Sequence, residues 1–322
     1  MKKEELRIVF MGTPEFAVGT FKALVEGGYH VVAVVTQPDK PVGRHGSVLQ
    51  PSPVKQYAVE HQIPVLQPER MKDPVFVEQL RSYRADLQVV VAFRMLPEIV
   101  WNMPRFGTFN VHASLLPQYR GAAPINWAII NGEKETGITT FFLDHQIDTG
   151  RVIMQKPFII PDNADVEYVY DGLMGLGAQL AIETIDSILK SDGNLPTIPQ
   201  EENGILYDAP KIFKETCRIN WHQSAKKIYD FIRGLSPYPG AWTELSELDN
   251  ERKIPLKIFR TSKTTRPSTG RIGEMQIEDN HLYVSTLDTQ IEIFELQLSG
   301  KKRMPTKDFL NGFHGYSLML KD

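Results

Sequence analysis

The hydrophobic pattern starts with a short apolar run, Leu6–Met11, which predicts a buried strand. After the turn Gly12–Pro14, apolar residues recur at helical spacing until Gly27 and Gly28 end the pattern. Tyr29–Thr36 is then a continuous β-branched run, as expected of a strand that is buried on both faces. Strand, helix and strand in this order predict a β-α-β unit, and hence an α/β fold with a doubly wound, mostly parallel sheet.

The same alternation of elements continues to about residue 190. The predicted helices are Val54–His61, Pro74–Arg81, Ala122–Asn131 and Val166–Leu189. The predicted strands are Ile63–Leu66, Asp86–Phe93, Gly137–Leu143 and Arg151–Ile160, together with one that carries Asn110 and His112. We therefore expect residues 1–190 to form the first domain.

A change in composition marks the end of this domain. Ser191–Pro210 is rich in Pro, Gly, Asn and acidic residues, which is typical of an interdomain linker. A helix over Ser224–Leu235 and then short alternating runs predict that residues 211–322 form a smaller C-terminal β-barrel of the oligonucleotide-binding type. The runs are Leu256–Phe259, Met275–Ile277, His281–Ser285 and Gln290–Leu298. Lys301, Lys302 and Arg303 follow the last run directly.

Composition is that of an ordinary globular protein, with 42% hydrophobic and 23% charged residues. The apolar part of the opening MKKEELRIVFMG is too short for a signal peptide or a membrane span, so we expect a cytoplasmic protein with no membrane partner. The only cysteine, Cys217, excludes an internal disulfide and a multi-cysteine zinc site.

Charge is distributed unevenly along the chain. Residues 211–322 carry 18 Lys and Arg against 14 Asp and Glu, a net charge of +4, so residues 1–210 carry −7 of the total of −3. A basic C-terminal domain suits a polyanionic partner, although a solvated surface explains the same excess.

Nucleotide cofactors are poor candidates. Gly12 stands alone, without the other glycines of a dinucleotide fingerprint, and the sequence holds no phosphate-binding P-loop. The long loop Gln37–Pro53 carries Lys40, Arg44 and His45, and a loop of this length is either functional or a disordered surface excursion.

The candidate chemistry lies in the segment FNVHASLLPQYRG and in the later turn LDHQIDTG. Asn110 and His112 are two apart on a predicted strand, so their side chains should project from one face. An amide that stabilises an oxyanion and an imidazole that acts as a general base suit acyl transfer to an amine. Asp148, in the turn before Gly150, is the carboxylate expected to orient that imidazole.

Other interpretations of these residues remain open. A single histidine on a strand is often a hydrogen-bonded core residue. A metal site made of His112, Asp144, His145 and Asp148 lacks the usual ligand spacing. Ser114 lacks the flanking glycines of a nucleophilic serine.

The chain resembles the folate-dependent formyltransferases. The resemblance rests on NVHASLLPQYRGAAPINWAIINGEKETGIT followed by DTG, and on RIVFMGTPEFA, VVTQPDKPVGR, PSPVK, IPVLQPE and SPYPGAW, in order along nearly the whole chain. It implies transfer of a formyl group from 10-formyltetrahydrofolate, without a metal, to the α-amino group of initiator methionyl-tRNA, in support of translation initiation. It further implies that Asn110, His112 and Asp148 are catalytic and that Ser114, Leu115, Leu116 and Pro117 lie against the folate.

The resemblance also implies tRNA contacts. The loop Gln37–Pro53 is expected at the acceptor stem, with Arg44 as its key arginine, and the C-terminal barrel with Lys301, Lys302 and Arg303 is expected to grip the tRNA. The family's pair of lysines after that arginine is replaced here by Ser47 and Val48, so tRNA binding should be weaker or differently distributed. Arg94 stands where relatives commonly have glycine, and we expect it to face solvent rather than the anionic tail of the folate.

Two alternatives to this function remain. A formyltransferase acting on a small amine, such as a nucleotide sugar or glycinamide ribonucleotide, would use the same three residues. A nucleic-acid-binding protein with an inactive first domain would need none of them. For the leading interpretation, a monomer is expected.

Overall fold

The computed structural model describes residues 1–42, 48–247, 253–312 and 318–321, which form two compact units. Unit 1 comprises residues 1–121, 135–159 and 170–208, and unit 2 comprises residues 122–134, 160–169 and 209–322. Unit 2 thus takes up two short segments that precede residue 170, besides the C-terminal region.

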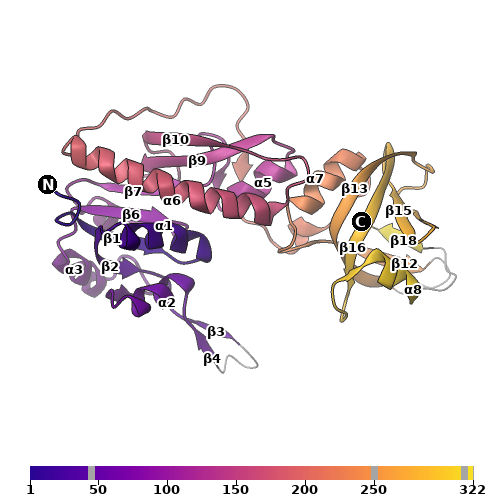
Figure 1. Ribbon diagram of the computed structural model, residues 1–322, viewed down its shortest axis with the longest axis horizontal. Helices are drawn as coiled ribbons and strands as arrows, with labels where there is room; N and C mark the ends of the chain where they lie inside the picture. Colours follow the sequence, from indigo (N-terminus) through magenta and orange to yellow (C-terminus); the bar gives the residue numbers. More distant parts are fainter. Residues whose placement is uncertain (43–47, 248–252, 313–317, 322) are drawn as a thin grey trace. The chain divides into compact units, whose positions relative to one another are not determined.

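Unit 1 is built on a seven-stranded sheet with the order β10-β9-β7-β6-β1-β2-β5 (Figure 1). Its strands are β1 (Arg7–Gly12), β2 (His30–Val35), β5 (Val65–Leu66), β6 (Leu87–Val91), β7 (Thr108–His112), β9 (Glu135–Phe142) and β10 (Val152–Ile159). Strands β5, β2, β1, β6 and β7 pair in parallel, and β9 and β10 extend the sheet in antiparallel fashion. The predicted doubly wound, mostly parallel sheet is confirmed.

Helices cover both faces of this sheet. The helices that accompany the sheet are α1 (Glu15–Glu26), α2 (Pro53–Glu60), α3 (Pro74–Ser82), α4 (Glu98–Trp101) and α6 (Val166–Lys190). Phe10 of β1 stacks on Phe21 of α1 with ring centroids 5.0 Å apart. Val9 and Met11, the residues on either side of Phe10 in β1, point to the opposite face and pack with α3 and α4 in one hydrophobic core. A Cβ on Gly177 of α6 would lie 3.3 Å from Val111 of β7. Helix α6 therefore packs closely on the same face of the sheet as α1.

Local sequence explains several helix ends. Ser52 caps α2 by accepting a hydrogen bond from the Lys55 amide at 3.1 Å, and Pro53 occupies its first turn. Asp73 caps α3 in the same way, through the amide of Val75 at 2.9 Å. These caps satisfy amides that have no partner inside the helix.

The loop Gln37–Pro53 is a hairpin where the structure describes it. Strands β3 (Lys40–Val42) and β4 (Val48–Gln50) pair in antiparallel fashion beyond β2 (Figure 1). Asp39 fixes the base of the hairpin by accepting hydrogen bonds from Lys55 at 2.6 Å and Gln67 at 2.7 Å. The Lys55 ammonium group and the Gln67 amide hold the pKa of Asp39 below its ordinary value. The start of this loop is therefore tied to α2 and to the residue that follows β5.

Unit 2 contains a curled antiparallel sheet with the order β14-β15-β16-β13-β12-β18. Its strands are β12 (Ala241–Glu247), β13 (Lys253–Pro267), β14 (Met275–Glu278), β15 (His281–Ser285), β16 (Thr289–Leu298) and β18 (Leu318–Lys321), with β17 (Met304–Pro305) paired to β16. A bridge between Glu274 and Met319 links the two ends of the sheet, which gives it a barrel-like shape. The expected smaller C-terminal β-barrel is thereby confirmed as a curled half-barrel.

The remaining elements are short. Helices α5 (Pro124–Ile130), α7 (Ala225–Arg233) and α8 (Thr306–Asn311) and the 3-10 turn η2 (Glu215–Cys217) belong to unit 2. Strands β8 (Arg120–Gly121) and β11 (Asp208–Ala209) form a two-stranded sheet. Among the described residues, no helix combines the length and the apolar character needed to cross a bilayer.

Candidate functional site

Asn110 and His112 lie on β7, near the edge of the sheet where the parallel strands end. In the register of the sheet Asn110 lies beside Val90 of β6 and Phe141 of β9, and His112 lies beside Thr139. The intervening Val111 faces α6, so Asn110 and His112 share the opposite face, as predicted.

The imidazole of His112 is almost fully enclosed, with 6% of the side chain exposed. Its Nε2 lies 2.9 Å from the backbone carbonyl oxygen of Tyr119. A carbonyl can only accept a hydrogen bond, so Nε2 must carry a proton. Nδ1 is therefore the ring nitrogen that can take up a further proton, and it faces the carboxylate of Asp148.

Asp148 lies beside His112 but does not hydrogen-bond it. Its Oδ2 is 3.8 Å from Nδ1 of His112, which is an ion-pair distance and too long for a hydrogen bond. The same oxygen accepts a hydrogen bond from the backbone amide of Gly121 at 3.0 Å. Asp148 has a positive φ of 55°, and a Cβ on Gly150 would lie 1.7 Å from the carbonyl oxygen of Phe142. The turn therefore needs glycine at position 150 to bring the carboxylate here.

Asn110 is half-buried, and its side-chain amide makes no hydrogen bond within the part of the chain that the structure describes. Its position two residues before His112 on the same face places an uncommitted amide next to the imidazole. Such an amide can donate to a ligand, as the sequence predicts for an oxyanion.

The metal alternative receives no support. Asp144 accepts hydrogen bonds from the Gln146 amide and the Thr149 hydroxyl, so its carboxylate shapes the turn. His145 lies 3.8 Å from Glu98 and packs edge-on against Trp101. Outside residues 43–47, 248–252, 313–317 and 322, no group of three or more His, Cys, Asp or Glu side chains is arranged to hold a metal ion.

The predicted folate segment forms a tightly bonded loop after β7. Ser114 is fully buried, and its hydroxyl donates to the carbonyl oxygen of Gln118 at 2.6 Å. The Leu116 amide donates to the hydroxyl of Thr139 at 3.1 Å, while Leu115 and Pro117 stay half-buried. The hydroxyl of Ser114 is thus already used within the loop. The contact of Ser114–Pro117 with folate stays a prediction.

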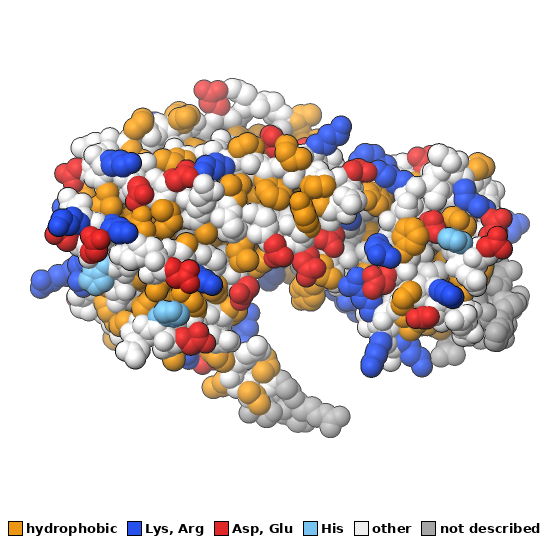
Figure 2. Space-filling model, viewed as in Figure 1, with side chains coloured by type: hydrophobic (Ala, Val, Ile, Leu, Met, Phe, Trp, Pro, Cys, Tyr) orange, Lys and Arg blue, Asp and Glu red, His pale blue; other side chains and the backbone are white. Residues whose placement is uncertain are grey.

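Of the predicted tRNA-binding residues, Arg44 lies outside the described residues. Lys301 and Lys302 are exposed after β16. Arg303 is different, because its guanidinium donates two hydrogen bonds of 2.7 Å to Glu295 and lies 4.3 Å from the ring centre of Phe259. On the face shown in Figure 2, Lys and Arg side chains gather over the C-terminal sheet, with acidic side chains among them. One of the three cations is therefore balanced within the protein.

The expectation that Arg94 faces solvent is wrong. Its guanidinium donates hydrogen bonds to the backbone carbonyls of Pro68 and Glu69, the latter at 2.9 Å. Burial lowers the pKa of Arg94, and its Nε is buried without a hydrogen-bond partner. Because its guanidinium is bonded to two backbone carbonyls of the loop before α3, Arg94 braces that loop.

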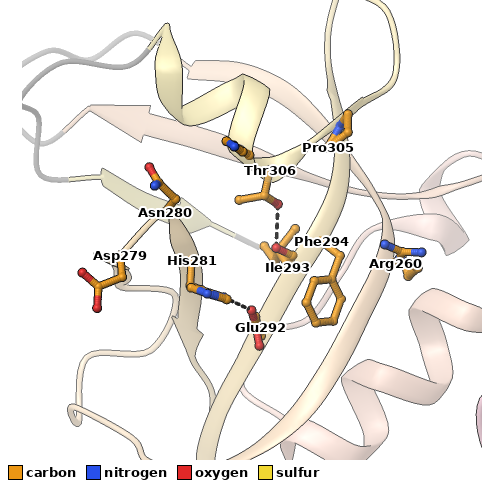
Figure 3. Close-up of a pocket in the computed structure, with 10 residues that line it drawn as sticks. Arg260, Asp279, Asn280, His281, Glu292, Ile293, Phe294, Pro305 and Thr306 are labelled. Carbon is orange, nitrogen blue, oxygen red and sulfur yellow. Dashed lines mark hydrogen bonds and ion pairs between the residues drawn. The ribbon is translucent and has the colours of Figure 1, made fainter.

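A separate cavity of about 430 Å³ lies in unit 2, between the β14–β15 turn, β16 and the start of α8 (Figure 3). Its lining mixes charges: Arg260 and Lys307 are basic, while Asp279 and Glu292 are acidic. The carboxylate of Glu292 lies 2.5 Å from Nδ1 of His281. Among the residues that the structure describes, none that is predicted to be catalytic or to bind folate or tRNA lines this cavity.

Two residues at the site were missed by sequence reasoning. Tyr119 holds His112 through its backbone carbonyl, which no side-chain pattern can reveal. Gln200 donates hydrogen bonds of 2.9 Å to the carbonyl oxygens of Asp148 and Gly150, although it lies in the predicted linker. The polar composition that marked this segment as a linker concealed its place at the site.

Comparison with known proteins gives consistent matches. Residues 6–185 match the family described as formyl transferase, and residues 211–314 match the formyl transferase C-terminal domain. A methionyl-tRNA formyltransferase of Parabacteroides distasonis is 60% identical over 318 residues, 97% of each chain. One of Bacteroides fragilis is 59% identical over 98% of this chain and 97% of its own.

Solved structures share the fold. HypX from Aquifex aeolicus, in complex with tetrahydrofolic acid, has a TM-score of 0.63 at 18% identity; the match covers 95% of this chain and 47% of HypX. The sugar 3N-formyl transferase WlaRD also has a TM-score of 0.63 at 18% identity, over 92% of this chain and 99% of its own.

Proposed function

We infer the reaction of this chain from a premise that its sequence establishes: it belongs to the formyl transferase family. We propose that it transfers the formyl group of 10-formyltetrahydrofolate to the α-amino group of initiator methionyl-tRNA, and so serves translation initiation. The observation that carries this proposal is the identity of about 60% to methionyl-tRNA formyltransferases over nearly the full length of both chains.

His112 is the general base of the proposed reaction. The amine nitrogen attacks the formyl carbon and loses a proton to Nδ1 of His112, since Nε2 already donates to the Tyr119 carbonyl. The bond between the formyl carbon and the folate nitrogen then breaks, and the same proton passes to that leaving nitrogen. General acid and base catalysis of this kind contributes about 100- to 10,000-fold in rate.

Asn110 and Asp148 stabilise the two charges that develop. The free amide of Asn110 donates to the formyl oxygen as it becomes negative, which is worth roughly 100- to 1000-fold in rate. Asp148, at 3.8 Å from Nδ1, stabilises the imidazolium that forms when His112 takes the proton. The tautomer of the neutral ring is set by the Tyr119 carbonyl, and Asp148 acts mainly on the charged form.

The acceptor distinguishes this function from its alternatives. A small amine does not require a basic second domain, whereas Lys301 and Lys302 are exposed and residues 211–322 carry a net charge of +4. Because the identity to methionyl-tRNA formyltransferases extends over both units, an inactive nucleic-acid-binding protein is also disfavoured. A monomer in the cytoplasm, where charged initiator tRNA is found, completes the proposal.

The test offers the protein 10-formyltetrahydrofolate with either methionyl-tRNA or glycinamide ribonucleotide. We expect formylation of methionyl-tRNA alone, and loss of most activity in Asn110→Ala and His112→Ala variants that keep the parent's thermal unfolding midpoint. Formylation of the small amine alone would support the small-amine alternative. A parent protein that binds tRNA without formylating either acceptor would establish the nucleic-acid-binding alternative.

A further inference from the structure

The structure assigns a positioning role to Gln200, which lies in the segment of residues 197–207, here termed the strap. The inference rests on the function proposed above. The hydrogen bonds of Gln200 go to Arg120 and to the backbone carbonyls of Asp148 and Gly150. Gln200 joins the two loops that hold His112 and Asp148 in place.

Both the nitrogen and the oxygen of the Gln200 side-chain amide form hydrogen bonds. Nε2 donates to the carbonyl oxygens of Asp148 and Gly150, each at 2.9 Å. Oε1 accepts from Nε of Arg120 at 3.1 Å and from its Nη2 at 2.7 Å. A half-buried amide with four such contacts is fixed in orientation, because each end of the group meets only partners of the complementary kind.

Both groups held by Gln200 belong to the catalytic arrangement. On one side lies Asp148 itself, whose carboxylate faces His112. On the other side lies Arg120, between Tyr119, whose carbonyl holds Nε2 of His112, and Gly121, whose amide binds Asp148. Gln200 therefore closes a ring of contacts around the imidazole and sets the separation between the two loops.

The strap itself is anchored on both sides of Gln200. Before it, Ile198 and Val152 exchange two backbone hydrogen bonds of 2.8 and 2.9 Å. After it, Tyr207 accepts a hydrogen bond of 2.6 Å from the Tyr119 amide, and the two tyrosine rings stack with centroids 6.0 Å apart. Gln200 thus projects from a fixed backbone and can transmit that fixed position to Asp148.

The contacts require an amide and not a carboxylate. In Gln200→Glu the bond to Arg120 becomes an ion pair, but a carboxylate oxygen replaces the donor that faces the Asp148 and Gly150 carbonyls. In Gln200→Met both sets of hydrogen bonds disappear with little change in side-chain volume. If the role of Gln200 were only to hold Arg120, the glutamate variant would be as active as the parent.

The experiment measures kcat and the KM for each substrate in the full-length parent, Gln200→Met and Gln200→Glu. We expect kcat to fall about 10- to 100-fold in both variants, as for a misplaced catalytic group, while KM for the folate donor stays unchanged. Glu201→Ala is the matched control, since Glu201 is exposed and, among the described residues, accepts a hydrogen bond from Asn203 alone. It should keep the parent's kcat.

A double-mutant cycle with Asp148→Asn tests whether the loss of kcat in Gln200→Met acts through Asp148. If Gln200 acts through Asp148, adding Gln200→Met to Asp148→Asn causes no further loss of kcat. Parent-like kcat in Gln200→Glu, or a full additional loss in the double variant, would overturn the inference. Should Gln200→Met fail to fold, the near-isosteric Gln200→Glu decides alone. A parent that formylates nothing refutes the proposed function instead.

Discussion

Replacing Asp148 by Asn removes one negative charge that lies 3.8 Å from Nδ1 of His112. The two side chains are 12% and 6% exposed, so solvent screens them only partly. Two unit charges at about 4 Å attract each other by roughly 4 kcal/mol at an effective dielectric constant of about 20. This attraction exists only once His112 has taken the proton. Its loss therefore raises the reaction barrier, and we expect kcat to fall about 100- to 1000-fold.

The fold should survive this substitution. Asn retains an oxygen that can accept the Gly121 amide, and it tolerates the left-handed φ of 55° found at position 148. Asp192→Asn is the matched control, because Asp192 is exposed and has a similar φ of 49°. The assay is single-turnover formyl transfer to methionyl-tRNA at saturating donor, with thermal unfolding of each variant. If Asp148→Asn transfers formyl groups at the parent's rate, the charge on Asp148 has no catalytic role and the proposed mechanism is refuted.

Three further predictions concern stability and binding. Gly150→Ala should lower the free energy of unfolding in urea by about 1–3 kcal/mol, because the added Cβ would meet the Phe142 carbonyl. Gly175→Ala should instead stabilise the protein, because no atom lies near the added Cβ. Equal changes in the free energy of unfolding for the two variants would contradict this prediction. Lys301→Ala and Lys302→Ala should each reduce the salt dependence of tRNA binding by about one unit in the log–log slope, and Arg303→Ala should do so less because of Glu295; identical slopes in fluorescence polarisation would refute it. Hydrogen bonds, first of all from the Ala225 amide, lower the pKa of Asp288, so this carboxylate should stabilise the fold above the unfolded pKa of about 3.9 and lose that effect as the pH falls. The difference in unfolding midpoint between parent and Asp288→Asn should therefore shrink from pH 7 to pH 3, and a constant difference would contradict it.

Hydrophobic pattern was sufficient to predict the sheet of unit 1. Within Tyr29–Thr36, residues 31–35 are apolar and buried at every position, and only a strand covered on both faces accommodates that. Alternation along β7 likewise placed Asn110 and His112 on one face. These features depend on neighbours in the sequence, which is why the sequence alone was informative.

Unit 2 was harder to predict, because its long strands carry few apolar residues. The run Leu256–Phe259 covers only a short part of β13, which continues to Pro267. Beyond the buried Thr261, the side chains of residues 262–267 alternate between half-buried and exposed positions. Strand β12 escaped prediction altogether. Polar strands of this kind are stabilised by pairing with their neighbours and leave little hydrophobic signal.

The position of Asp148 depends on a chain reversal that no periodicity encodes. Strand β9 runs antiparallel to β7, so Leu143, the first residue after β9, lies beside Thr108, where its amide donates to the Thr108 carbonyl at 2.9 Å. Thr108 is four residues before His112, about 13 Å along an extended strand. Residues 143–151 must therefore fold back along β7 to bring the Asp148 carboxylate to His112. The left-handed Asp148, the close packing at Gly150 and the hydrogen bonds from Gln200 all act on this returning segment. The returning segment is therefore held from two sides, by the Gly121 amide on the Asp148 carboxylate and by Gln200 of the strap on the Asp148 and Gly150 carbonyls.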